Sequence, residues 1–173
     1  MTTAPDPPIA SRHLRVSSTK GAIDIFFTPQ PRLTVGSTRR AQQAVRIVKS
    51  TLKRIKNCEI RQSHEGVTAQ ASGENHLLVR NILEFIDRKL DHLESEPLTT
   101  KMVEEILKIS SRERVRWTKD GRLPSTGKAS FKRGKNRVHL FMYPPLAIAE
   151  LASRPQIVTD WRAADSTEAV SGT

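Results

Sequence analysis

The sequence predicts an α+β protein made of two parts, and three observations support this prediction. Residues 13–96 contain short runs of β-branched and aromatic residues between two long amphipathic stretches, a pattern typical of an α+β domain. Residues 97–153 combine two short helical stretches with a hairpin rich in lysine and arginine. The chain has 173 residues, enough to bury two small cores. The pattern of residues 13–96 identifies no known fold.

The distribution of charge indicates a polyanionic partner. The chain has 29 lysines and arginines against 18 aspartates and glutamates, which gives a net charge of +11. Residues 38–57 contain seven basic and no acidic residues, residues 98–143 contain twelve and four, and the intervening residues 58–97 contain four and eight. Two basic blocks separated by an acidic stretch favour surfaces that meet phosphates over an evenly solvated exterior.

Composition argues against several classes of protein. No run approaches the roughly 18 apolar residues of a membrane span, so we expect no membrane partner. The single cysteine, Cys58, cannot form an intramolecular disulfide or build a thiolate zinc site. The first residues lack the basic leader and apolar segment of a secretory signal. We therefore expect a disordered arm over residues 1–12 and a cytoplasmic, nucleoid-associated protein.

The first half of the domain over 13–96 is predicted to be a hairpin and a helix. His13–Ser17 and Ala22–Thr28 are rich in strand-forming residues and flank a turn at Gly21, which predicts two paired strands. From Thr38 the apolar residues recur at helical spacing, namely Ala41, Ala44, Val45, Val48, Leu52 and Ile55. The opposite side of this helix carries a candidate secondary basic surface of Arg46, Lys49, Lys53 and Lys56. The sequence leaves open whether DNA, an acidic protein or only solvent covers it.

The second half repeats this order. Cys58–Gln62 and Val67–Ala71 alternate with period two on either side of Gly66, which predicts a second hairpin. An amphipathic, acidic helix follows and ends before Pro97, with apolar positions at Leu78, Val79, Ile82, Leu83, Ile86, Leu90 and Leu93. The predicted order is strand-strand-helix-strand-strand-helix. We expect this domain to mediate dimerisation or to bind a partner protein.

Residues 98–121 predict two short helices joined by a three-residue turn. The first helix carries its apolar residues on one face, at Met102, Val103, Ile106 and Leu107. Ser110 and Glu113 have the spacing of a capping box, which begins the second helix. Gly121 is placed to end it, because glycine readily adopts the left-handed conformation. Trp117 is predicted to fill the core between the helices.

The following segment, Leu123–Tyr143, is predicted to form a basic hairpin around Gly134. A hairpin in this position is a wing beside the two helices. After Ser153 the sequence shows little periodicity apart from Ile157, Val158 and Trp161. We expect residues 154–173 to be a mostly flexible tail.

The order of several residues in this segment follows the pattern of a known family. The matching positions are Leu98-Thr99, Val103, Ile106-Leu107, Ile109-Ser110, Trp117, Gly121-Arg-Leu-Pro124 and Tyr143–Leu151. On these residues the segment resembles the excisionase-type, MerR-like winged helix-turn-helix DNA-binding domain. The resemblance implies that the second helix enters the major groove, that the wing follows the minor groove or backbone, and that the protein forms dimers or arrays. The sequence departs from the family at Arg114 and Thr118, where buried aliphatic residues are usual.

The residue types of the second helix and the wing suit duplex DNA. Arg112 and Arg116 are four residues apart on one helical face beside Glu113, so all three are predicted to read bases. A guanidinium matches guanine O6 and N7, and a carboxylate accepts from cytosine N4. The predicted contacts with the DNA backbone are Ser110, Lys119, Lys128, Lys132, Arg133, Lys135 and Arg137.

Catalysis, a metal and a cofactor are not expected. The glycines of Gly121–Lys128 are one residue too far apart for a phosphate-binding loop, and Ala129 lacks the hydroxyl that holds magnesium. The histidines show no pair at i, i+4 on one helix and no thiolate neighbours.

These observations predict a bacterial, phage or plasmid protein that binds specific sequences of double-stranded DNA. It would regulate transcription, or act as an architectural factor of recombination, replication or partition, and it would self-associate. One alternative is an antitoxin-like or adaptor protein that binds a protein through residues 13–96 and DNA through its C-terminal domain. A weaker alternative is an accessory nuclease.

Overall fold

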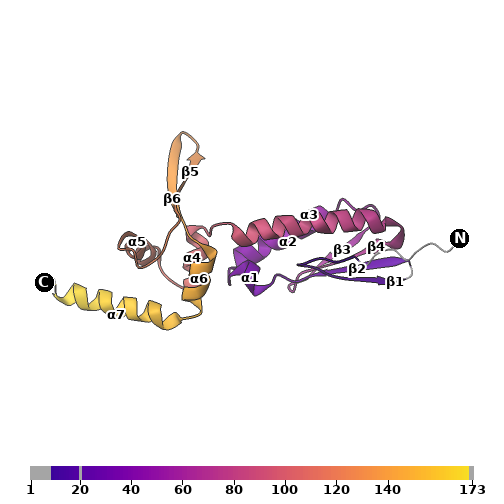
Figure 1. Ribbon diagram of the computed structural model, residues 1–173. Coiled ribbons are helices and arrows are strands. Elements are labelled where there is room, and N and C mark those ends of the chain that lie inside the picture. The colour runs from indigo at the N-terminus through magenta and orange to yellow at the C-terminus, as the bar shows by residue number, and fades with distance from the viewer. Residues whose placement is uncertain (1–8, 20, 172–173) are drawn as a thin grey trace. The chain divides into compact units, whose positions relative to one another are not determined.

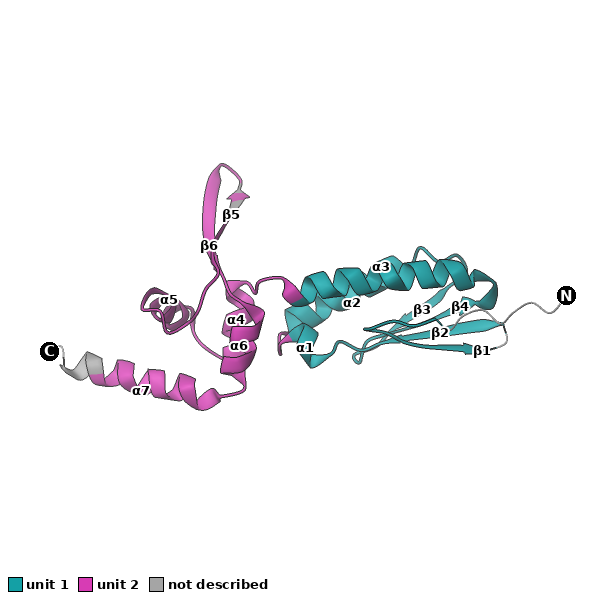
Figure 2. Cartoon of the chain, viewed as in Figure 1, with its two compact units in different colours: residues 1–34, 38–94 teal, residues 35–37, 95–173 magenta. Residues whose placement is uncertain are grey.

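The computed structural model describes residues 9–19 and 21–171, which form a mixed α+β structure (Figure 1). The chain divides into two compact units (Figure 2). Unit 1 comprises residues 1–34 and 38–94, and unit 2 comprises residues 35–37 and 95–173. The predicted mixture of helices and strands is therefore confirmed. Each unit has its own cluster of buried apolar side chains.

Unit 1 contains a four-stranded antiparallel sheet. Its strands are β1 (Arg15–Thr19), β2 (Ala22–Phe27), β3 (Glu59–Gln62) and β4 (Val67–Ser72), in the spatial order β1-β2-β4-β3. Alternate residues of the two central strands are buried, as the period of a strand requires, namely Ile23, Ile25, Phe27, Val67, Ala69 and Ala71. At the start of β4 only glycine fits, because a Cβ atom on Gly66 would lie 1.9 Å from the carbonyl oxygen of Phe27.

The two long helices of unit 1 cover one face of this sheet. The helices of the unit are α1 (Pro31–Thr34), α2 (Thr38–Leu52) and α3 (His76–Ser95), the last preceded by a 3-10 turn at Gly73–Asn75. Figure 1 shows α2 and α3 on the same side of the sheet. Their apolar stripes and the inner face of the sheet form one core. Apart from α1 and the 3-10 turn, the order of elements is the predicted one.

Polar side chains connect α2 and the N-terminal segment to α3 in unit 1. Buried Arg40 of α2 donates to the carbonyl oxygens of Leu93 and Glu94, where the C-terminal end of α3 attracts positive charge. Asp87 of α3 accepts from the Ser11 hydroxyl at 2.7 Å and from the Arg12 amide at 3.0 Å. These two bonds correct the prediction of a disordered arm for residues 11–12, because a buried carboxylate holds them. Residues 1–8 lie outside the described part.

Unit 2 consists of two short helices, a hairpin and two further helices. The elements are α4 (Thr100–Leu107), α5 (Ser111–Lys119), β5 (Gly127–Arg133), β6 (Asn136–Met142), α6 (Pro145–Ala152) and α7 (Pro155–Ser171). Trp117 is fully buried, as predicted, among Leu98, Val103, Leu107, Leu123, Tyr143 and Ile148. Leu98 and Tyr143 exchange two backbone hydrogen bonds of 2.7 and 3.0 Å. This bridge fastens the base of the hairpin to the start of the helical pair.

Helix α7 corrects the prediction of a flexible tail. Val158 is 5% exposed within the core of unit 2, and the ring of Trp161 meets that of Trp117 edge-on at 5.0 Å between centroids. The helix buries only a few apolar residues, so its sequence lacks the long stripe that predicts a helix. Contacts with the rest of unit 2, rather than a pattern of apolar residues in its own sequence, explain why this segment is helical. No helix in the described residues is long and apolar enough to cross a membrane.

Candidate nucleic-acid interface

Helix α5 presents a row of three cations on the side opposite its buried tryptophan. At about 100° per residue, Arg112, Arg116 and Lys119 fall within an arc of about 60°, and Trp117 lies on the other side. All three cations are exposed. The sequence assigns Lys119 to the DNA backbone, but its position places it on the same face as the two arginines.

The start of α5 is held in place by its predicted capping box. The Ser110 hydroxyl accepts from the Glu113 amide at 3.2 Å, and Glu113 Oε2 accepts from the Ser110 amide at 2.6 Å. Lys108 ends α4 in the left-handed conformation, with φ of 54°, and the Ile109 amide donates to Glu104 O at 3.1 Å. The turn from Lys108 to Ser110 has the predicted three residues.

The position of Glu113 argues against its predicted role in reading bases. Its Oε1 accepts from Arg162 Nε at 2.6 Å, while its Oε2 belongs to the capping box. The hydrogen bond from Arg162 lowers the pKa of Glu113 to about 2, against the opposing effect of desolvation. Both oxygens therefore serve the fold of unit 2, and cytosine could be read only by breaking these bonds. We therefore assign Glu113 a structural role in the contact between α5 and α7.

Asp165 of α7 positions Arg116. Its Oδ2 lies 2.8 Å from Arg116 Nη1 and accepts from the buried Trp117 indole at 2.9 Å, and its Oδ1 accepts from Arg122 at 2.7 Å. The side chain of Asp165 is 10% exposed, whereas that of Arg116 is 57% exposed. Although desolvation raises the pKa of Asp165, the hydrogen bonds from Arg122 and Trp117 lower it overall. The carboxylate thus stays charged and limits the directions that Arg116 can take.

The two departures from the family pattern form one polar cluster. Arg114 donates to Glu104 Oε1 at 2.9 Å and to the Tyr143 hydroxyl at 3.0 Å, and the Thr118 hydroxyl lies 2.9 Å from that same oxygen. The cluster joins α4, α5 and the end of β6.

The hairpin carries its described cations mainly on one face. Residues directly opposite each other in an antiparallel pair share a face, and the register pairs Lys128 with Phe141, Ser130 with His139 and Lys132 with Arg137. Lys128 Nζ lies 5.0 Å from the centre of the Phe141 ring, a cation–π distance. We call Lys128, Lys132 and Arg137 the hairpin cationic face.

The two remaining predicted wing residues lie near the tip of the hairpin. Lys135 is exposed in the two-residue turn with Gly134, whose φ is 63°. The backbone of Arg133 belongs to β5, opposite Asn136, but its side chain lies outside the described part. Five of the six predicted cations from Lys119 to Arg137 are thus exposed on α5 or the hairpin.

The predicted secondary basic surface belongs to unit 1. Arg46 lies on the outer side of α2, and Lys53 and Lys56 follow the end of that helix, all three exposed. Lys49 is half-buried, and its Nζ donates to Gln62 Oε1 at 3.0 Å. The predicted site residues therefore fall into two groups, one in each unit.

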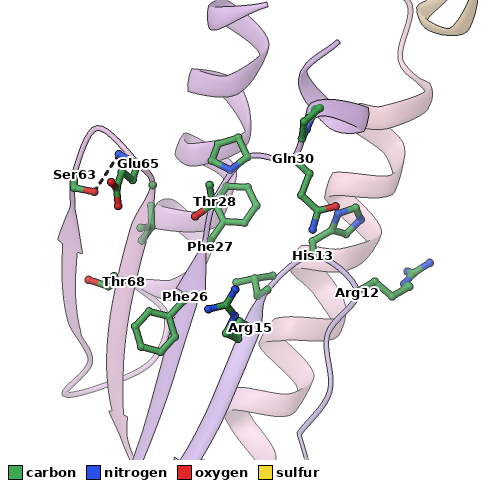
Figure 3. A pocket seen from close by; sticks show the side chains of 15 residues that line it. Arg12, His13, Arg15, Phe26, Phe27, Thr28, Gln30, Ser63, Glu65 and Thr68 are labelled. Atoms are coloured by element: carbon green, nitrogen blue, oxygen red, sulfur yellow. Dashed lines mark hydrogen bonds between the residues drawn. The ribbon is translucent and has the colours of Figure 1, made fainter. Parts of the chain in front are cut away.

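Unit 1 also contains a cavity of about 550 Å³ at one end of its sheet (Figure 3). Figure 3 shows Phe26, Phe27, Gln30 and Arg15 around it, with Ser63 and Glu65 on the β3–β4 turn. Its lining mixes aromatic, amide, hydroxyl and charged groups. This mixture favours no single ligand chemistry.

One group of side chains in unit 1 has the composition of a metal site. Ligand atoms of His13, Asp91 and Glu94 lie within 4.8 Å of one another. Asp91 pairs with Arg12 and with His13 Nε2, and Glu94 lies 3.9 Å from Arg32. The hydrogen bond from His13 is the main cause of the lowered pKa of Asp91. Because arginines already balance both carboxylates, we assign the group to ion pairing.

Comparison of the chain with protein-family models, curated proteins and solved structures found no significant match. The interpretation of unit 2 therefore depends on its own residues. The sequence analysis missed Asp165 and Arg162, which position Arg116 and Glu113. Asp165 is four residues after Trp161 and three after Arg162, so on a helix it would neighbour both side chains. This signal could be read only once residues 155–171 were recognised as helical.

Proposed function

We propose that the protein binds double-stranded DNA at specific sequences through a winged helix-turn-helix in unit 2, as an excisionase-like or MerR-like regulator or architectural factor. The observation that carries the proposal is the row of Arg112, Arg116 and Lys119 on the open side of α5. The hairpin that follows has a cationic face of its own. Cations on both a short helix and an adjoining hairpin suit the major groove and the neighbouring backbone, respectively.

The dimensions of the row fit a short stretch of base pairs. From Arg112 to Lys119 the helix rises about 10.5 Å, which corresponds to about three base pairs at 3.4 Å each. Arg112 and Arg116 can each present two parallel N–H donors to a guanine, and Lys119 can reach a third base or a phosphate. In this proposal the hairpin supplies affinity without choice of sequence.

The alternative of a protein-binding adaptor draws on a different observation. Leu77 and Leu78 at the start of α3 are 62% and 40% exposed, and adjacent exposed leucines are typical of contact surfaces. Either self-association or a partner protein would cover them. This surface is compatible with DNA binding by unit 2, so the adaptor role extends the proposal rather than replacing it.

The proposal is tested by selecting duplexes from random DNA and comparing variants on the selected site and on unrelated DNA. Arg112→Ala and Arg116→Ala should each lose about 1–3 kcal/mol of binding free energy on the selected site and little on unrelated DNA. The double variant Lys132→Ala/Lys135→Ala should weaken binding to every duplex alike and reduce its salt dependence.

A matched control is the single variant Arg154→Ala, which removes an exposed arginine of unit 2 that lies outside α5 and the hairpin. It should bind the selected site nearly as well as the wild type. Equal losses on selected and unrelated DNA for Arg112→Ala and Arg116→Ala would exclude base recognition by α5. A wild-type chain that prefers no duplex would overturn the proposal.

A further inference from the structure

Helix α2 carries a second row of cations that the proposed function does not use. Arg39, Arg46, Lys49 and Lys53 follow one another at spacings of seven, three and four residues. Lys53 directly follows the end of α2, but its amide still donates to Lys49 O at 3.3 Å, so the helical path continues. The four residues fall within an arc of about 80° and span about 21 Å. We call them the α2 cationic stripe.

No acidic side chain of the described residues forms an ion pair with this stripe. The segment 38–57 contains no aspartate or glutamate at all. Lys49 therefore has like charges three residues before it and four residues after it, each of which destabilises a helix by about 0.2–0.5 kcal/mol. The neighbouring Arg40 differs, because it is buried and bonds to the end of α3. The fold uses Arg40 to join α2 to α3, whereas the structure describes one side-chain hydrogen bond within the stripe, from Lys49 to Gln62.

A groove of about 580 Å³ runs beside the stripe. Arg46 and Lys49 line it from α2, and Gln62, Ser63 and His64 line it from the end of β3 and the turn after it. No carboxylate is among its lining residues. The hydrogen bond from Lys49 to Gln62 fixes the lysine at the wall of the groove. The groove therefore offers hydrogen-bond donors and positive charge together.

Positive charge continues from the end of the stripe onto α3. Arg54, Arg88 and Lys89 lie 5.2, 5.8 and 4.8 Å from the centre of the Phe85 ring. These cation–π contacts hold three like charges close together. All three side chains are exposed, so water screens their mutual repulsion, and they add positive charge beside the end of the stripe.

We propose that the α2 cationic stripe and its groove bind the phosphate backbone of duplex DNA, as a second contact surface carried by unit 1. This inference rests on the proposed function, since the occupant is the same class of duplex. A linear row suits a backbone that carries one charge per 1.7 Å of duplex axis. The stripe has no aromatic side chain on which unpaired bases could stack, which disfavours single strands. Binding at this surface is independent of base sequence.

The test uses the full chain and a duplex that carries the selected site. Arg46→Gln/Lys49→Gln/Lys53→Gln should weaken binding to all duplexes and lower the slope of log affinity against log salt by about 0.9 for each phosphate that the variant no longer neutralises, up to about 2.7. The control Arg15→Gln/Arg32→Gln/Arg61→Gln removes three exposed cations from β1, α1 and β3 of the same unit. It should keep the slope of the wild type. Circular dichroism of both variants serves to check that they are folded.

The outcomes separate this inference from the proposed function. If the stripe variant keeps wild-type affinity and slope while Arg112→Ala/Arg116→Ala loses binding, the stripe faces solvent or an acidic protein, and the inference is wrong. If both triple variants reduce the slope equally, only total charge matters, and the inference is also wrong. If the stripe variant reduces the slope while Arg112→Ala/Arg116→Ala binds normally, the stripe is supported and the assignment of α5 fails. A wild-type chain that binds no duplex overturns both.

Discussion

At the scale of single residues, Asp165 connects the fold of unit 2 with its candidate DNA surface. One carboxylate accepts hydrogen bonds from the buried Trp117 indole and from Arg122, and it pairs with Arg116. A fully buried indole N–H needs an acceptor, because water cannot reach it. The same carboxylate therefore satisfies the core on one side and orients an exposed guanidinium on the other.

The first prediction concerns Asp165→Ala. It leaves a buried donor without a partner and removes the carboxylate shared by two arginines, so the free energy of unfolding of unit 2 should fall by roughly 2–4 kcal/mol. Denaturant unfolding followed by tryptophan fluorescence measures this change. Asp160→Ala, at an exposed position of the same helix, should change stability by less than about 0.5 kcal/mol. Similar effects from both variants would show that Asp165 has no special structural role.

The polar cluster of α4, α5 and β6 gives a second prediction. Tyr143→Phe removes only the hydroxyl that bonds to Arg114 and Thr118 and leaves the buried ring in place. The loss in stability of unit 2 should be about 1 kcal/mol, the net value of a typical hydrogen bond. A double-mutant cycle with Thr118→Val would measure the coupling between the two hydroxyls. Additive effects in that cycle would argue against the contact.

At the scale of elements, the turn between α4 and α5 stores strain at one residue. Lys108 has φ of 54°, a conformation that glycine adopts without the steric cost of a Cβ atom. Lys108→Gly should therefore raise the free energy of unfolding of unit 2 by about 0.5–1 kcal/mol. Lys108→Ala keeps the Cβ atom and should leave stability nearly unchanged. If glycine destabilised unit 2 as it does within a helix, the left-handed conformation would be wrong.

The hydrogen bonds and ion pairs of Glu104 and Glu113, which connect α5 to α4 and α7, predict how the stability of unit 2 depends on pH. Hydrogen bonds from Lys101, Arg114 and Ser111 outweigh desolvation and lower the pKa of Glu104 to about 2, and Arg162 and Ser110 do the same for Glu113. In the unfolded chain both groups take up protons near their ordinary value of 4.5. Their stabilising effect is therefore complete above about pH 4.5 and is lost as the pH falls toward 2.

The variant Glu113→Gln isolates half of this effect. Glutamine can still complete the capping box but cannot form the ion pair with Arg162. Between about pH 4.5 and 2 the stability of this variant should fall less steeply than that of the wild type. The two curves should converge at the acidic end and differ most at neutral pH. A constant difference over the whole range would show that the charge of Glu113 is unimportant.

Elements with a long apolar stripe could be predicted from the sequence, and those held by a few distant contacts could not. Helices α2 and α3 follow from the spacing of residues such as Val48 and Leu83, and α5 follows from its capping box. Helix α7 escaped prediction because Val158, Trp161 and Asp165 gain their partners only in the folded unit. For the same reason the sequence predicted that Glu113 was available to read bases, since its ion-pair partner Arg162 lies 49 residues away in the chain.

At the scale of the whole molecule, the two units have separate cores and different spectroscopic signals. The buried apolar residues form one cluster in each unit. Both tryptophans of the chain, Trp117 and Trp161, lie in unit 2. Tryptophan fluorescence therefore follows the unfolding of unit 2, whereas circular dichroism follows the helices of both units.

This difference allows the last prediction, on Leu83→Ala in the core of unit 1. Leu83 is fully buried, and the cavity left by alanine should cost unit 1 about 2–5 kcal/mol. Because this packing lies within the core of unit 1, the denaturant midpoint measured by circular dichroism should fall while the midpoint measured by fluorescence stays unchanged. Val103→Ala in the core of unit 2 is the matched control and should lower the fluorescence midpoint. If Leu83→Ala lowered both midpoints equally, the units would unfold as one cooperative body, and loss of DNA binding in a unit 1 variant would then have to be checked against the folding of α5.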